Sequence, residues 1–127
     1  MRKLTGNSDP TEIGRITLDE ALTLLPTPEG KRSAAVFEHG TMQVKLYAPR
    51  ESDPQSPHTR DEVYVVARGK GWFVMELSGE RSGEQRHRFG PNDVLFAKAG
   101  VRHRFEDFSD DLAVWVMFYG PEGGEKD

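Results

Sequence analysis

The sequence contains no cysteine. Disulfides, thiolate zinc sites and cysteine nucleophiles are therefore excluded, and any bound metal must be held by nitrogen and oxygen ligands. The chain also has no apolar run near the roughly 20 residues that a membrane-spanning helix requires. Its first residues lack the apolar stretch of a signal peptide. From these absences we expect a cytoplasmic protein that makes no membrane contact.

An excess of basic residues is also missing. The chain has 17 Lys and Arg against 21 Asp and Glu, and a formal net charge of −4. Proteins that bind nucleic acid normally carry a basic face, so we expect no nucleic-acid partner. A length of 127 residues suits one domain with a sizeable core. We expect a flexible arm over residues 1–14, a single domain over 15–121 and a tail over 122–127.

Short apolar and β-branched segments, separated by turn signals, fill most of the chain. One short helix is predicted at 18–25, because Thr17 and Glu20 form a capping box before it and prolines follow it. Strands are predicted at 33–37, 42–47, 62–67, 72–77, 85–89, 94–97, 101–105 and 112–119. Many short strands with one peripheral helix indicate an all-β sandwich or barrel, and their irregular spacing favours a jelly roll or a Greek-key barrel.

Two of the four histidines and one glutamate stand out as a candidate metal site. His58 precedes Glu62 by four residues, so both side chains would share a face if the strand reached back to His58. His103 follows the glycine turn at Gly100. Two histidines and one carboxylate with open positions suit non-haem Fe(II), and Mn, Ni, Co and Zn also accept such ligands. Taken singly, each of the three is more typical of an ordinary loop, strand or turn residue.

These residues together resemble the two motifs of the cupin family, which consists of small β-barrels of the jelly-roll type. The first motif runs glycine, five residues, His-x-His, three or four residues, glutamate, six residues, glycine. His58 matches its second histidine, Glu62 its glutamate and Gly69 its last glycine. In the second motif, His103 matches the histidine and Gly100 the glycine of Pro-x-Gly. The resemblance extends over roughly residues 40–121 and implies a cupin-type jelly-roll barrel with a short N-terminal helix.

The resemblance also implies a ligand set for a divalent transition metal, with Fe, Mn, Ni and Zn as the candidates. His58, Glu62 and His103 would be the ligands at the mouth of the barrel. Ser56 stands at the position of the leading histidine of the first motif. Gln55, beside it, is the candidate for a fourth ligand through its amide oxygen.

Residues around this set are candidates for a substrate pocket. Strand alternation places Tyr64 on the face of Glu62 and Phe105 on the face of His103, so both rings are predicted to line the pocket. Arg60, Arg102 and Arg104 flank the site and could attract an anionic substrate. Charges at strand ends are, however, more typical of a solvated rim.

Two functions with a small-molecule ligand follow from the resemblance. The first is a mononuclear metal-dependent enzyme of the dioxygenase or isomerase type, in which three protein ligands leave room for water and substrate. The sequence identifies no separate general base for such a reaction. The second is a non-catalytic module that binds or senses a small molecule or a metal. For either function we expect a homodimer, in which the N-terminal hairpin and helix pack on a partner barrel.

Overall fold

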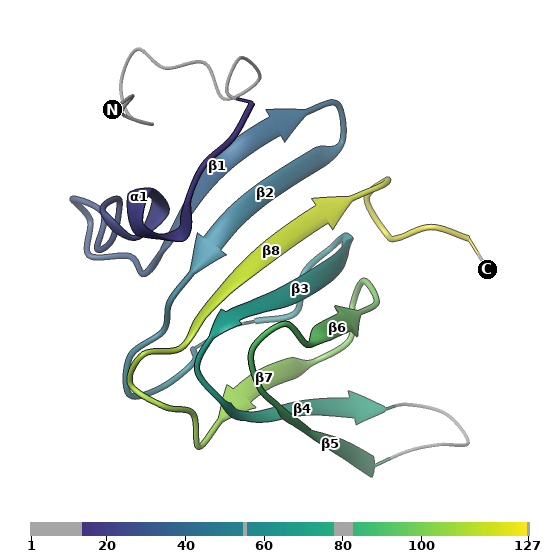
Figure 1. Cartoon of the computed structure of the whole chain (residues 1–127). Coiled ribbons are helices and arrows are strands. Elements are labelled where there is room, and N and C mark those ends of the chain that lie inside the picture. Colours follow the sequence, from purple (N-terminus) through teal and green to yellow (C-terminus); the bar gives the residue numbers. More distant parts are fainter. Residues whose placement is uncertain (1–13, 55, 78–82, 127) are drawn as a thin grey trace.

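The chain folds into two antiparallel β-sheets that pack against each other, with one short helix outside them (Figure 1). The structure is a computed structural model, and it describes residues 14–54, 56–77 and 83–126. Its elements are α1 (Leu18–Leu22), β1 (Ser33–His39), β2 (Met42–Tyr47), β3 (Asp61–Arg68), β4 (Gly71–Leu77), β5 (Gly83–Phe89), β6 (Val94–Ala97), β7 (His103–Glu106) and β8 (Ala113–Tyr119). The predicted fold class, all-β with a short N-terminal helix, is confirmed.

The larger sheet has the strand order β1-β2-β8-β3-β6, and the smaller sheet has the order β5-β4-β7. β8 therefore lies between two strands that come much earlier in the chain, and it pairs antiparallel with both (Figure 1). This crossing of early and late strands agrees with the predicted jelly-roll or Greek-key arrangement rather than with a meander.

The main core lies between the two sheets. Alternate residues of β8 point into it, because strand side chains alternate between faces: Val114, Val116 and Phe118 are buried there, next to Tyr64 from β3 and Phe73 from β4. The rings form a chain of edge and tilted contacts. This packing holds the two sheets in a fixed relation at the end where the candidate site lies.

A second core lies on the outer face of the larger sheet, under α1. Val36, Leu46 and Ala113 are buried in it together with Ala21 of the helix. β2 therefore contributes to both cores. Leu46 faces the helix, and Tyr47 packs against the cluster between the sheets.

Thr17 caps the start of α1 as predicted, and Glu20 contacts it through the Thr17 hydroxyl rather than through the Thr17 amide of a full capping box. The amide of Glu20 donates to Oγ1 of Thr17 over 3.1 Å, and the Thr17 hydroxyl donates to Oε1 of Glu20 over 3.1 Å. The helix ends at Leu22, three residues before the predicted end. The amides of Leu24 and Leu25 already bond three residues back, in the tight pattern that closes a helix. No described helix is long and apolar enough to cross a membrane.

The strand predicted at 101–105 begins later than expected, at His103. The amide of Val101 donates to the Lys98 carbonyl over 3.0 Å, so Val101 still belongs to the turn around Gly100. The other strand boundaries differ from the predicted ones by two residues or fewer.

Candidate metal centre

Three side chains meet at one end of the space between the sheets. His58 comes from the loop before β3, Glu62 is the second residue of β3, and His103 is the first residue of β7. One possible ligand atom from each lies within 4.8 Å of the other two. Nε2 of His103 is 2.6 Å from Oε1 of Glu62, and Nε2 of His58 is 3.8 Å from the same oxygen. The structure therefore brings together the three residues that the sequence pattern singled out.

Each of the three side chains is positioned by a different part of the fold. Glu62 sits on a strand that is paired on both sides, with Phe118 of β8 and Ala97 of β6 as its register partners. His103 is on the smaller sheet, opposite Met75 of β4. The site thus spans the two sheets, and its geometry depends on how they pack.

His58 reaches the site from a loop, not from a strand. β3 begins at Asp61, so the alternation argument that placed His58 and Glu62 on one face does not apply. The loop is instead tied to the turn before β7, because the amide of Gly100 donates to the His58 carbonyl over 2.8 Å. The imidazole also packs edge-on against Phe118, with ring centroids 5.0 Å apart.

Glu62 is buried, and its carboxylate is not compensated by a well-placed hydrogen bond among the described residues. The residue is 1% exposed, and neither carboxylate oxygen has a hydrogen-bond partner of good geometry among the described residues. Burying an ionised carboxylate in this way is costly unless a positive group compensates it. The two imidazole nitrogens approach the same oxygen, and nitrogen and oxygen donors of this kind suit a divalent transition metal. The residues therefore fit a metal ion.

The His103 ring is held in the orientation that a metal ligand needs. Its Nδ1 is 2.8 Å from the Val101 carbonyl oxygen, so an Nδ1–H donates there and Nε2, 2.6 Å from Oε1 of Glu62, is the nitrogen that a proton or a metal ion would occupy. Burial lowers the pKa of His103, but the Glu62 carboxylate and the Val101 carbonyl favour the protonated ring, and the net pKa is raised. The surroundings thus attract a positive charge, whether a proton or a metal ion.

The pKa of His58 shifts in the opposite direction. Burial lowers it, and the positive charges of His103 and Lys45 add to this effect, while Glu62 opposes it. The lowered pKa favours the neutral form of His58, which is the form that binds metals.

The predicted pocket residues lie next to the three side chains, but deep in the core. Tyr64 is fully buried, and its hydroxyl is 2.8 Å from Nε2 of His103. Phe105 is 2% exposed and makes edge-on or tilted ring contacts with Tyr64, Phe73 and Phe89. A role of Tyr64 and Phe105 in substrate binding stays a prediction.

Ser56 stands where the first cupin motif has its leading histidine, with Gln55 beside it, and the structure describes only Ser56 of the two. Gln55, the candidate fourth ligand, lies outside the described residues. Ser56 is exposed and lines a hollow of about 170 Å³ with Asp53 and His103.

Sequence reasoning missed Asp53 in the loop after β2. Its carboxylate accepts hydrogen bonds from the Tyr47 hydroxyl and, over 2.7 Å, from the amide of Phe105. It thereby ties the loop before the site to both sheets. No local sequence pattern marks Asp53, because one partner, Tyr47, lies on β2 and the other, Phe105, lies on β7, 52 residues along the chain.

Two hollows with shared lining residues lie beside His58, and Glu62 lines one of them. The inner one, of about 150 Å³, is lined by Lys45, Tyr47, His58, Glu62 and Phe118 among others. The outer one, of about 280 Å³, shares Lys45, His58 and Phe118 with it.

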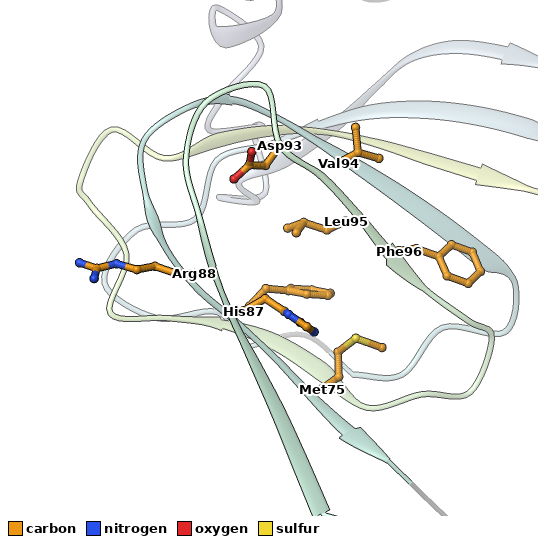
Figure 2. Close-up of a pocket in the computed structure, with 8 residues that line it drawn as sticks. Met75, His87, Arg88, Asp93, Val94, Leu95 and Phe96 are labelled. Atoms are coloured by element: carbon orange, nitrogen blue, oxygen red, sulfur yellow. The ribbon is translucent and has the colours of Figure 1, made fainter. Parts of the chain in front are cut away.

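A separate cavity of about 330 Å³ lies between the smaller sheet and β6. Figure 2 shows Met75, His87 and Leu95 directed toward it. None of the three candidate ligands lines this cavity.

Comparisons with known proteins are consistent with one family. A family model described as the cupin domain matches residues 43–119. The uncharacterized protein SCO3923 of Streptomyces coelicolor is 36% identical over 83 residues, which cover 64% of this chain and 72% of that relative.

Solved structures resemble the fold at low sequence identity. Protein BH2720 of Bacillus halodurans is similar with a TM-score of 0.67 and 16% identity, over 90% of this chain and 86% of that one. A cupin-2 domain protein of Shewanella frigidimarina has a TM-score of 0.56 and 15% identity, over 83% and 94% of the two chains. At these identities the likeness concerns the fold alone.

Proposed function

This chain belongs to the cupin family, and from that premise we propose that it is a metal-dependent enzyme acting on a small molecule. His58, Glu62 and His103 would hold one divalent transition metal. The observation that supports this most directly is the buried Glu62 carboxylate, which has no hydrogen-bond partner of good geometry among the described residues and is approached by two imidazole nitrogens.

The bound metal would supply Lewis acidity or a redox centre with positions open to substrate. The chain's own residues define the rest of the reaction site. His58 is only partly buried, with its side chain 35% exposed, so the site opens on its side. Phe118 and Val116 form an apolar wall of the inner hollow, which limits the entry of water. Dioxygenation and isomerisation are the reaction types we propose for this arrangement.

The metal can be tested directly. Purified protein without a histidine tag is reconstituted with Fe(II), Mn(II), Ni(II) or Zn(II), and bound metal is measured per chain. We expect one metal ion per chain in the wild type and loss of it in Glu62→Gln and His103→Ala. His87→Ala is the matched control, because His87 is exposed and outside the cluster. A wild type that binds none of the four metals, or a Glu62→Gln variant that binds them equally well, would refute the metal site.

The metal should also raise the stability of the fold. A ligand that binds only the folded state at 100 times its Kd stabilises it by about 2.7 kcal/mol. The melting temperature should therefore rise with the preferred metal in the wild type and in His87→Ala, but not in Glu62→Gln.

A non-catalytic binding or sensing module is the second candidate. It is favoured by one observation: the Tyr64 hydroxyl lies 2.8 Å from Nε2 of His103, so a protein partner for that nitrogen already exists. Oxygen consumption by the Fe(II)-loaded protein, measured with a panel of small diketones, phenols and thiols, separates a dioxygenase from an isomerase or a sensing module. Uptake with any of them supports a dioxygenase, whereas bound metal without uptake favours isomerisation or sensing.

A further inference from the structure

Two cations at the outer side of the candidate metal centre have no carboxylate partner among the described residues. They are Lys45 of β2 and Arg60 of the loop before β3, and both line the outer hollow. Elsewhere in the described part of the chain, Arg86, Arg102 and Arg104 each lie within 4.0 Å of a glutamate. These three arginines are thus neutralised within the protein, whereas Lys45 and Arg60 have no carboxylate within 4.0 Å among the described residues.

Lys45 is directed at the candidate site by the alternation of β2. Its neighbour Leu46 faces the helix, and Lys45 takes the opposite face together with Tyr47. It is half-buried and lines both hollows. A half-buried ammonium beside the candidate metal ligands favours the binding of an anion there.

Arg60 is held in place without losing its charge. Its Nη1 donates to the carbonyl oxygen of Thr41, and its guanidinium carbon lies 5.8 Å from the centroid of the Phe118 ring. Neither contact neutralises it. A planar guanidinium with free donors is well suited to bind a carboxylate.

The space around these cations defines the shape of a ligand. The outer and inner hollows share Lys45, His58 and Phe118 in their walls, and Glu62 lies in the wall of the inner one. Each hollow is smaller than the 300–1,000 Å³ typical of sites for drug-sized ligands, so the ligand must be small. It would meet a positive rim first, then the face of an aromatic ring, and then the candidate metal ligands.

We infer that the ligand is a small organic acid, whose carboxylate binds Lys45 and Arg60 while its other end extends past Phe118 toward His58 and Glu62. The identity of the acid as a substrate rests on the proposed function, but the anion site itself does not. Glu122 is the one carboxylate on the described rim of the outer hollow. On the rim of the outer hollow, two cations against one carboxylate leave a single positive charge, which matches a monocarboxylate better than a doubly charged phosphate; Glu62 lies farther in, in the wall of the inner hollow.

Calorimetric titration with mandelate and with its neutral analogue mandelamide tests the anion site. The titrations use Zn(II)-loaded protein, because Zn(II) has no redox chemistry. We expect mandelate to bind more tightly than mandelamide. Lys45→Gln should weaken mandelate binding about tenfold, as expected for the loss of one charge-assisted hydrogen bond, and should leave mandelamide binding unchanged. Arg60→Gln should act in the same direction.

Two further variants serve as controls. Lys31→Gln removes a positive charge from an exposed position outside the hollow, and mandelate binding should not change. Glu122→Gln removes the opposing negative charge, and mandelate binding should become tighter. The melting temperature of every variant shows whether it is folded.

The outcomes separate this inference from the proposed function. Metal content is measured in the same samples, and the titrations are repeated in metal-free protein with chelator. Absence of metal refutes the metal centre, while a Lys45-dependent preference for mandelate in metal-free protein still supports the anion site. Mandelate binding that is insensitive to both Lys45→Gln and Arg60→Gln in folded protein overturns the anion site. Inorganic phosphate that binds as tightly as mandelate overturns the assignment to a carboxylate.

Discussion

Gly69, the motif glycine between β3 and β4, should be intolerant of a side chain for two separable reasons. Its φ is +93°, and a Cβ at this position would lie 2.6 Å from Cα of Leu112 and 3.0 Å from its amide nitrogen. A non-glycine residue with positive φ costs roughly 1–2 kcal/mol, and overpacking a tight site costs roughly 1–3 kcal/mol. Alanine also lowers the conformational entropy of the unfolded chain, which offsets this destabilisation by roughly 0.4–1 kcal/mol. We expect Gly69→Ala to lower the free energy of unfolding by about 2–4 kcal/mol.

Two other glycines isolate the two effects. Gly30 has a similar φ of +84°, but a Cβ at this position would meet nothing within 4 Å, so Gly30→Ala tests the backbone strain alone, at about 1 kcal/mol. Gly71 has no positive φ, but its Cβ would lie 2.8 Å from Cα and Cβ of Phe108. Gly71→Ala therefore tests the close contact alone, at about 1–2 kcal/mol.

Urea unfolding of the metal-free protein measures all three losses on one scale. Chelator is present throughout, so that metal binding does not contribute to the stability. The loss for Gly69→Ala should exceed each of the other two. A Gly69→Ala variant that loses no more stability than Gly30→Ala would show that the approach of Leu112 does not constrain this turn.

Two further predictions concern the cap of α1 and the segment after β8. Thr17→Ala removes the hydroxyl that accepts from the amide of Glu20 and should lower the free energy of unfolding by about 0.5–2 kcal/mol, whereas Thr17→Ser should stay near the wild type; equal losses in urea unfolding would contradict this. The Asp61 carboxylate accepts from the amides of Glu125 and Ala99, each over 2.9 Å, and these bonds lower the pKa of Asp61. Because the folded pKa lies below the unfolded value, the stabilisation is present above about pH 4 and is lost as the pH falls through the folded pKa. Unfolding of metal-free protein between about pH 2 and 5 should show a weaker pH dependence in Asp61→Asn, and an unchanged dependence would refute this role.

The strand positions could be predicted from the sequence because turn signals are local. Glycine and proline mark most of the strand ends, and the observed strands begin and end within two residues of the predicted ones. The order of the strands could not be predicted in this way. It depends on which distant segments pair, as when Val63 of β3 and Val44 of β2 both align with Met117 of β8. The homodimer expected from the sequence stays a prediction.

The candidate ligands could be found by spacing, but the reason for their convergence could not. His58 reaches Glu62 because its carbonyl accepts from Gly100, a contact across 42 residues of chain that no alternation rule contains. Among the three arginines proposed to attract an anion, Arg102 and Arg104 pair with glutamates, and Arg60 alone has none among the described residues. Lys45 was missed, although its alternation with Leu46 was a usable signal.

The central place of β8 has a consequence for how the protein is made. The ribosome delivers β2 and β3 long before β8, yet the two strands meet only through β8. Until Ala113–Tyr119 has emerged, both earlier strands present bare edges, which are prone to pair with other chains. Completion of the larger sheet, and with it the apolar wall that Phe118 gives to the candidate site, is therefore expected only after synthesis of this segment. Truncation before Ala113 should yield aggregation rather than a smaller folded barrel.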